Sequence, residues 1–86
     1  MQHKDTIVKN TCLAYVVKHL PKEIDRYYRL CGTLEDKQQY NLSEKLQWNL
    51  VIHLTCVFKT LIVFDTEAQE EYKELFEMIN EFEKEN

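Results

Sequence analysis

The chain has 86 residues with 11 basic and 15 acidic side chains, and its formal net charge is −4 at neutral pH. Its 44% hydrophobic and 30% charged content exclude a disordered chain, and this length allows one domain, residues 1–86, around a single core. Glycine and proline occur once each, at Gly32 and Pro21. Small β folds turn often and need several of both, so the composition predicts an all-α protein.

Neither the cysteines nor the apolar segments indicate secretion or a membrane. Cys12, Cys31 and Cys56 are an odd number without close spacing, so we expect reduced, buried thiols and no disulfide framework. The first ten residues lack the apolar stretch of a signal peptide. The most apolar run, residues 48–64, is interrupted by polar side chains and falls short of the roughly 20 apolar residues of a membrane span. We therefore expect a cytoplasmic protein with no membrane partner.

The first half of the chain predicts two helices that meet at Pro21. Apolar residues at helical spacing predict the first helix over residues 4–19. The N–H groups in the first turn of a helix are unpaired, so proline, which has no N–H, is suited to that position. Pro21 is therefore expected to begin a second helix at about residues 22–31. Glycine is the usual residue just past a helix C-terminus, so this helix would end at Gly32. Its buried side would carry Ile24, Tyr28 and Cys31.

Residues 44–64 are expected to form the central helix of the fold. A short helical turn is predicted before it, from Thr33 through Gln39, and Ser43 is a suitable N-cap. Apolar side chains cover most of the circumference of this segment, as in a helix that is surrounded by others. Its main apolar stripe is expected at Leu50, Leu54, Val57, Leu61 and Phe64.

Residues 51–64 also permit a different structure, because alternate positions are apolar and many are β-branched, as in a strand. Fourteen residues without a turn signal would be a long strand in so small a protein, so helix is favoured. The predicted fold is a compact four- or five-helix bundle. The alternative is an α+β fold with a strand or hairpin within residues 51–64.

Residues 65–86 are the most acidic part of the sequence. Nine carboxylates and two lysines give this segment a charge of −7, so residues 1–64 carry +3. Thr66 is expected to cap a helix whose glutamate-rich first turn suits the positive end of the helix dipole. One face of this helix is acidic and the opposite face is apolar. The apolar stripe consists of Tyr72, Leu75, Ile79 and Phe82, flanked by Phe76 and Met78.

The acidic face of this last helix carries the main functional hypothesis. Glu70, Glu74, Glu77 and Glu81 lie at helical spacing, although like charges four residues apart destabilise a helix by about 0.2–0.5 kcal/mol per pair. A face that keeps these charges despite the repulsion indicates recognition of a positively charged surface. The competing interpretation is a solvated face that maintains solubility.

A basic stripe on the second predicted helix supports a second hypothesis. Lys22, Arg26 and Arg29 could contact phosphates, with Tyr27 stacking on a base. Three cations on an acidic chain are few for a nucleic-acid-binding protein, so nucleic acid is the less favoured partner. The same cations could instead bind the acidic helix of their own chain.

The residues capable of chemistry do not form a recognisable motif. His53 and Cys56 are three residues apart on the predicted central helix, and His19, Cys12 and Cys31 could complete a zinc site with them. However, no two cysteines have the two-to-four-residue spacing of structural zinc sites. A single glycine cannot supply a glycine-rich phosphate loop. We therefore predict no enzyme activity, no metal and no cofactor.

The sequence thus predicts a small, acidic, non-catalytic protein-binding module of the inhibitor, antitoxin, immunity-protein or adaptor type. Its partner would be a protein with a basic surface, which the C-terminal helix contacts. The alternative is a small nucleic-acid-binding regulator that uses Lys22, Arg26 and Arg29. A homodimer is compatible with both hypotheses.

Overall fold

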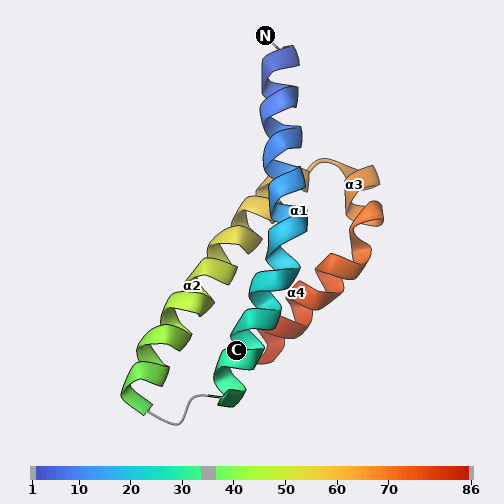
Figure 1. The fold of residues 1–86 in the computed structure, drawn as a ribbon. Helices are drawn as coiled ribbons and strands as arrows, with labels where there is room; N and C mark the ends of the chain where they lie inside the picture. Colours follow the sequence, from blue (N-terminus) through green and yellow to red (C-terminus); the bar gives the residue numbers. More distant parts are fainter. Residues whose placement is uncertain (1, 34–36, 86) are drawn as a thin grey trace.

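The computed structural model describes residues 2–33 and 37–85, which form four helices and contain no strand (Figure 1). The all-α prediction is therefore confirmed, and residues 51–62 are helical. The four helices follow one another in chain order as α1 (Gln2–Thr33), α2 (Lys37–Ile62), α3 (Thr66–Glu71) and α4 (Lys73–Glu85).

Helix α1 runs without interruption through Pro21, so the predicted break between two helices at this residue is wrong. An interior proline removes one backbone hydrogen bond and costs about 3 kcal/mol in a helix. Here the buried residues keep helical spacing across Pro21 with no change of phase, and their packing outweighs that cost. The buried side chains of α1 are Val16, Leu20, Ile24 and Tyr27.

Helix α2 begins at Lys37, well before the predicted start at residue 44, so Ser43 lies inside the helix and does not cap it. Residues 37–39 of the predicted third turn belong to the start of α2, and residues 34–36 lie outside the described ranges. At the other boundary, Gly32 is helical and α1 ends one residue later, at Thr33.

The buried stripe of α2 differs from the predicted one. Leu50 and Val57 are 40% and 43% exposed, and Phe64 lies beyond the end of the helix with 95% of its surface exposed. Periodicity could not select the packed side, because apolar residues surround most of this helix. The residues that face the core are Val51, Thr55, Phe58 and Ile62.

The thiols also depart from the prediction of buried cysteines. Cys12 and Cys56 are exposed, and Cys31 is partly buried. Cys56 is exposed because it lies outside the side of α2 that packs into the core. Free cysteine is apolar enough to be buried in a core, but the residue type alone does not determine whether a given cysteine is buried.

Helix α4 packs its apolar stripe onto α1 and α2, as the sequence predicts. Leu75, Ile79 and Phe82 are buried, and Tyr72 and Phe76 pack against the same core. The Phe82 ring meets the Tyr27 ring of α1 edge to face, with 5.2 Å between ring centroids. This is a favourable geometry for an aromatic pair.

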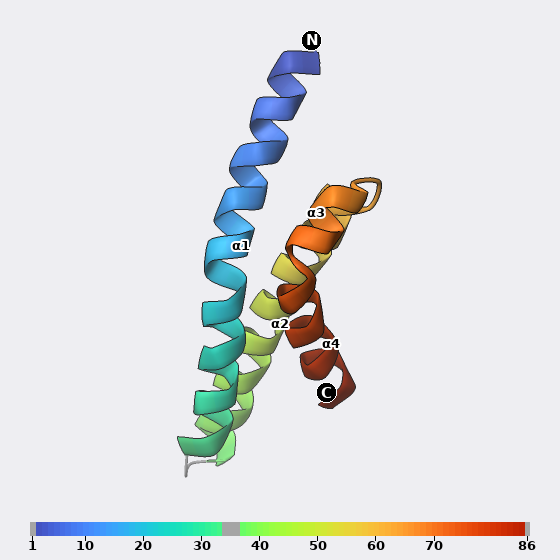
Figure 2. The same ribbon diagram turned by 90° about the vertical axis from the view of Figure 1, so that its right-hand side faces the viewer.

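The helices are arranged so that α3 and α4 cover one side of the antiparallel α1–α2 pair (Figures 1 and 2). The N-terminal end of α1 projects beyond the other helices in both views. The longest dimension of the molecule is 51 Å and the shortest is 15 Å. None of the helices in the described ranges combines the length and the apolarity that a membrane span requires.

The buried Thr55 hydroxyl generates a prediction about stability. Its Oγ1 atom has no hydrogen-bond partner among the described residues, and an unsatisfied buried polar group costs about 1–3 kcal/mol. We expect Thr55→Val, which keeps the branched shape, to raise the free energy of unfolding by about 1 kcal/mol in urea titrations.

The control for this prediction is Thr60→Val in the same helix. Thr60 is exposed, and its Oγ1 donates to the Cys56 carbonyl oxygen at 2.8 Å. Loss of this exposed bond should change stability by less than about 0.5 kcal/mol. A lower free energy of unfolding for Thr55→Val than for Thr60→Val would contradict the prediction.

Candidate functional site: an acidic depression beside α4

The connection between α2 and α3 determines where the acidic segment begins. The N-cap of α3 is Asp65, not Thr66 as predicted, and its Oδ1 atom accepts a hydrogen bond from the Ala68 N–H at 3.0 Å. The Gln69 side-chain amide donates to the carbonyl oxygens of Ile62 and Val63, at 2.8 and 3.1 Å. These bonds fasten the first turn of α3 to the end of α2.

A short break at Tyr72 separates α3 from α4, so the prediction of one C-terminal helix from Thr66 onward is wrong. The Tyr72 N–H still donates to the Ala68 carbonyl oxygen at 2.9 Å, so the chain changes direction without losing this backbone bond. The break places Glu70 on α3 and Glu74 on α4.

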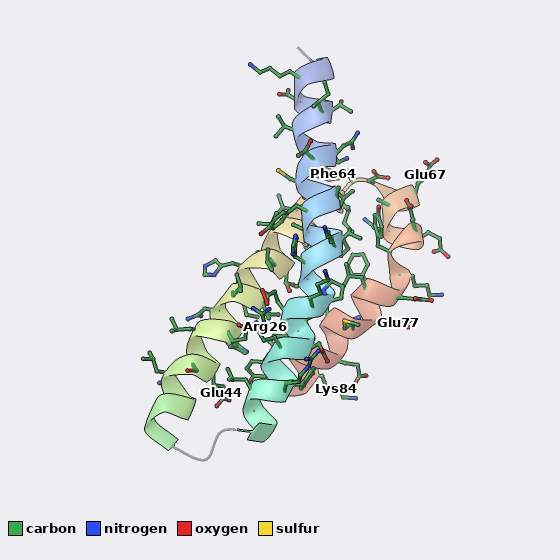
Figure 3. All side chains as sticks on the ribbon, in the orientation of Figure 1. Arg26, Glu44, Phe64, Glu67, Glu77 and Lys84 are labelled. Atoms are coloured by element: carbon green, nitrogen blue, oxygen red, sulfur yellow. The ribbon has the colours of Figure 1, made fainter. Side chains whose placement is uncertain are left out.

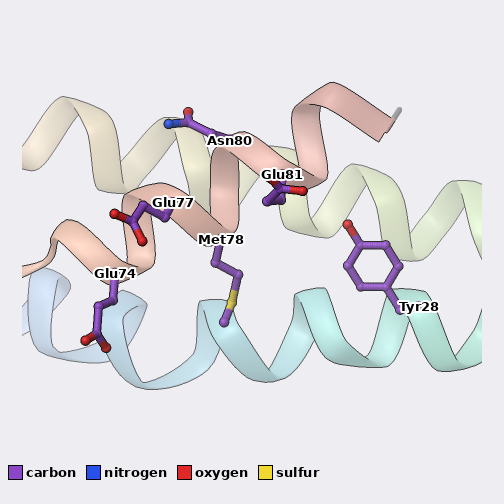
Figure 4. Close-up of a pocket in the computed structure, with 6 residues that line it drawn as sticks. All are labelled: Tyr28, Glu74, Glu77, Met78, Asn80 and Glu81. Carbon is purple, nitrogen blue, oxygen red and sulfur yellow. The ribbon is translucent and has the colours of Figure 1, made fainter.

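All four glutamates of the predicted site are exposed, but the structure gathers only three of them. Glu74, Glu77 and Glu81 line an open depression of about 640 Å³ together with Tyr28, Met78 and Asn80 (Figure 4). Glu70 does not line it. The depression therefore combines three carboxylates of α4 with the Tyr28 ring of α1.

Sequence reasoning missed the roles of Tyr28 and Met78. Tyr28 was expected in the core, yet it is 39% exposed, and Met78 is 41% exposed. In Figure 4 the Met78 side chain reaches from α4 toward α1, between Glu74 and Tyr28. In the sequence, one feature could have indicated this role of Met78: it lies beside the apolar stripe and among glutamates of the same helix.

The carboxylates of the depression differ from Glu83 in their ion pairs. Within the described residues, Glu74, Glu77 and Glu81 make no ion pair, whereas Glu83 accepts a 2.7 Å bond from the Lys59 Nζ of α2. Glu67 and Glu77 lie on the outer side of α3 and α4 (Figure 3). The surface formed by Glu74, Glu77 and Glu81 around Met78 and Tyr28 is called the acidic depression below.

The basic stripe lies on α1, and two of its three cations are already paired there. Arg26 Nη1 is 3.3 Å from Glu23 Oε1, and Arg29 forms an ion pair with Asp25. No ion pair between the described residues joins this stripe to the four predicted glutamates, so the structure does not show docking of the acidic helix onto it.

Tyr27 cannot stack on a base as the second hypothesis proposed, because it is buried. Its hydroxyl donates to Glu44 Oε1 at 3.2 Å. Burial, followed by the neighbouring Cys31 and Glu44, raises the pKa of Tyr27 well above its ordinary value. Its role is that of a core residue.

Within the described residues, the candidate zinc ligands are not gathered into one site. Cys12 and Cys31 lie on one continuous helix, where nineteen residues span about 28 Å, so they cannot join a common site. His53 and Cys56 are both exposed, and His53 Nδ1 lies 2.7 Å from the Asn49 carbonyl oxygen. In the part of the chain that the structure describes, no three His, Cys, Asp or Glu residues form a group suited to a metal ion.

Comparison with known proteins adds no identification: no protein-family model, curated protein or solved structure matches the chain. The functional hypothesis therefore depends on the site alone.

The Asp65 cap yields a prediction about pH. The Ala68 N–H and the ammonium group of Lys9, 3.5 Å away, lower the pKa of Asp65 below its usual value. Because the folded state has the lower pKa, the contribution of Asp65 to stability is present above about pH 4 and is lost as the pH falls. We expect Asp65→Ala to lower the melting temperature at neutral pH, and the difference from the wild type to shrink below about pH 4.

Two variants control for this effect. Asp65→Asn keeps a capping oxygen without the charge, so its melting temperature should fall between those of the wild type and Asp65→Ala. Thr66→Ala changes the residue that the sequence suggested as the cap, and we expect little effect. An equal or larger loss from Thr66→Ala would contradict the assignment of the cap to Asp65.

Proposed function

We propose that the chain is a non-catalytic protein-binding module that uses the acidic depression to bind a basic segment of a partner protein. The observation that carries this proposal is the placement of three carboxylates, which form no ion pair with the described residues, around the exposed Met78 and Tyr28 side chains. Opposite charge attracts the partner over a distance, and the apolar base of the depression offers it contact area.

The chemistry of the depression suits lysine and arginine side chains. Both have an apolar stem and a charged end, so the stem can lie on Met78 and the charge can reach Glu77 or Glu81. An arginine also stacks on an aromatic face, which the half-exposed Tyr28 ring can provide. A purely solvated acidic surface would not require these two apolar side chains to be exposed among the carboxylates.

The support beneath the depression favours binding without a large rearrangement. Helix α4 is attached to the body by the buried Leu75, Ile79 and Phe82, and the Lys59–Glu83 ion pair links it to α2. Carboxylates held on an ordered helix lose less conformational entropy on binding than carboxylates on a flexible tail. Glu70 of α3 would contribute to long-range attraction instead of direct contact.

The rival hypothesis of nucleic-acid binding through Lys22, Arg26 and Arg29 has less support. Two of these cations have carboxylate partners on their own helix, and Tyr27 belongs to the core. Phosphate binding would have to compete with Glu23 and Asp25 for the arginines. An overall charge of −4 also repels a polyanion.

The experiment compares two charge-matched double variants. Glu77→Gln with Glu81→Gln removes two charges at the depression, and Asp5→Asn with Glu67→Gln removes two charges elsewhere. The probe is a labelled peptide of alternating arginine and alanine, followed by fluorescence anisotropy at low salt. We expect the first variant to bind about 3- to 10-fold more weakly and the second to bind nearly as well as the wild type.

Salt and a second probe complete this test. Binding of the arginine peptide should weaken toward physiological salt, where charges are screened beyond about 8 Å. A peptide with glutamate in place of arginine should not bind. Equal weakening in both double variants, or unchanged binding in the Glu77 and Glu81 variant, would contradict a specific role for the depression.

A further inference from the structure

The side of the α1–α2 pair that faces away from α4 exposes several large apolar side chains. Helix α1 contributes Val8 and Tyr15, which are 56% and 58% exposed. Helix α2 contributes Leu46, Leu50 and Val57, which are 61%, 40% and 43% exposed and lie at helical spacing. Monomeric proteins rarely leave contiguous apolar patches of more than a few hundred Å² in water, and larger patches mark interaction sites.

A groove between the two helices crosses this surface. It has a volume of about 390 Å³, and its lining residues in the described part of the chain are all uncharged. Its lining residues are Thr11, Cys12, Tyr15, Val16, Leu54 and Val57. A groove of this composition suits apolar side chains of a partner. The surface made by these residues together with Val8, Leu46 and Leu50 is called the apolar face below.

The dimensions of the chain show how much surface it leaves uncovered. A compact monomer of 10.4 kDa has about 5,400 Å² of accessible surface, whereas this chain has 6681 Å², about 1,300 Å² more. Its radius of gyration is 14.9 Å, compared with about 12 Å for a compact domain of this length. A stable interface covers about 800 Å² on each partner, and the excess surface of the whole molecule is larger than this area.

The distribution of charge identifies an occupant for this face. The segment of charge −7 lies on the opposite side of the α1–α2 pair. Two copies that meet through their apolar faces therefore keep their acidic helices apart. A contact between the acidic helices of two copies would instead bring like charges together, which is costly.

We infer that a second copy of this chain covers the apolar face, in a symmetric dimer centred on the groove. In a two-fold contact the same patch meets itself, so the projecting Tyr15 ring of each copy would lie against the groove of the other. The α1–α2 pairs of the two copies would together form a four-helix core. This dimer goes beyond the proposed function, and it would present two acidic depressions on its outer sides.

Sedimentation velocity with two lysine variants tests the dimer. Val57 and Met78 have nearly equal exposure, 43% and 41%, but lie on opposite sides of the molecule. Val57→Lys places a charge in the apolar face, whereas Met78→Lys places one among the glutamates of α4. We expect the wild type and Met78→Lys to sediment at twice the 10.4 kDa chain mass and Val57→Lys to dimerise at least about tenfold more weakly.

A second measurement uses the wild-type chain alone. Cys12 lines the groove, so its rate of reaction with a thiol reagent should fall as the protein concentration rises through the dimer dissociation constant. In Val57→Lys the rate should not depend on concentration. Circular dichroism of each variant verifies that its helices are retained.

Three results would overturn the inference. The first is a wild-type chain that stays monomeric throughout the micromolar range. The second is a dimer that Met78→Lys disrupts and Val57→Lys does not. The third is assembly into larger, open-ended species, which would indicate a contact between unlike surfaces. A monomer that still bound the arginine peptide would leave the proposed function intact.

Discussion

The arrangement of this protein depends on the burial of one face of α4 against α1 and α2. Leu75, Ile79 and Phe82 lose nearly all contact with water, and burial of such side chains contributes about 1.5–3 kcal/mol each. Repulsion within the acidic face amounts to only about 0.2–0.5 kcal/mol per like-charged pair. Burial therefore prevails, and it holds Glu74, Glu77 and Glu81 in a fixed relation to Tyr28.

The same burial explains why the molecule has two unlike sides. Helix α4 covers one side of the α1–α2 pair and leaves the other to solvent, where Tyr15 and Val57 remain half exposed. The covered side bears the negative charge of the C-terminal segment, while the groove on the open side is lined by uncharged residues of the described chain. Attraction of a basic partner and contact between two copies then use opposite surfaces, so that neither interaction obstructs the other.

The sequence was sufficient to predict the helical class and the character of α4. Its apolar stripe lies at clean helical spacing and its opposite face is charged, so periodicity alone assigns the buried side. The same method failed for α2, where Leu50 and Val51 are equally apolar and only the neighbouring helix decides that Val51 is buried. The exposure of Cys56 has the same origin.

The remaining errors came from local rules that tertiary packing overrides. Proline begins many helices, yet the buried stripe of α1 passes Pro21 without a break. Asp65 and Thr66 are both good capping residues, and the hydrogen bond to the Ala68 N–H distinguishes them. Tyr28 could not be assigned to the acidic depression from sequence, because the depression forms only where α4 lies against α1.

Residue-by-residue hydrogen exchange of the backbone amides tests the central claim most directly. If burial of the α4 face holds the acidic depression in place, the amides of residues 75–82 should be protected together with those in the buried parts of α1 and α2. Exchange of α4 at the rate of an unstructured peptide, while α1 and α2 remain protected, would show that the acidic helix is not fixed to the body and would contradict the account.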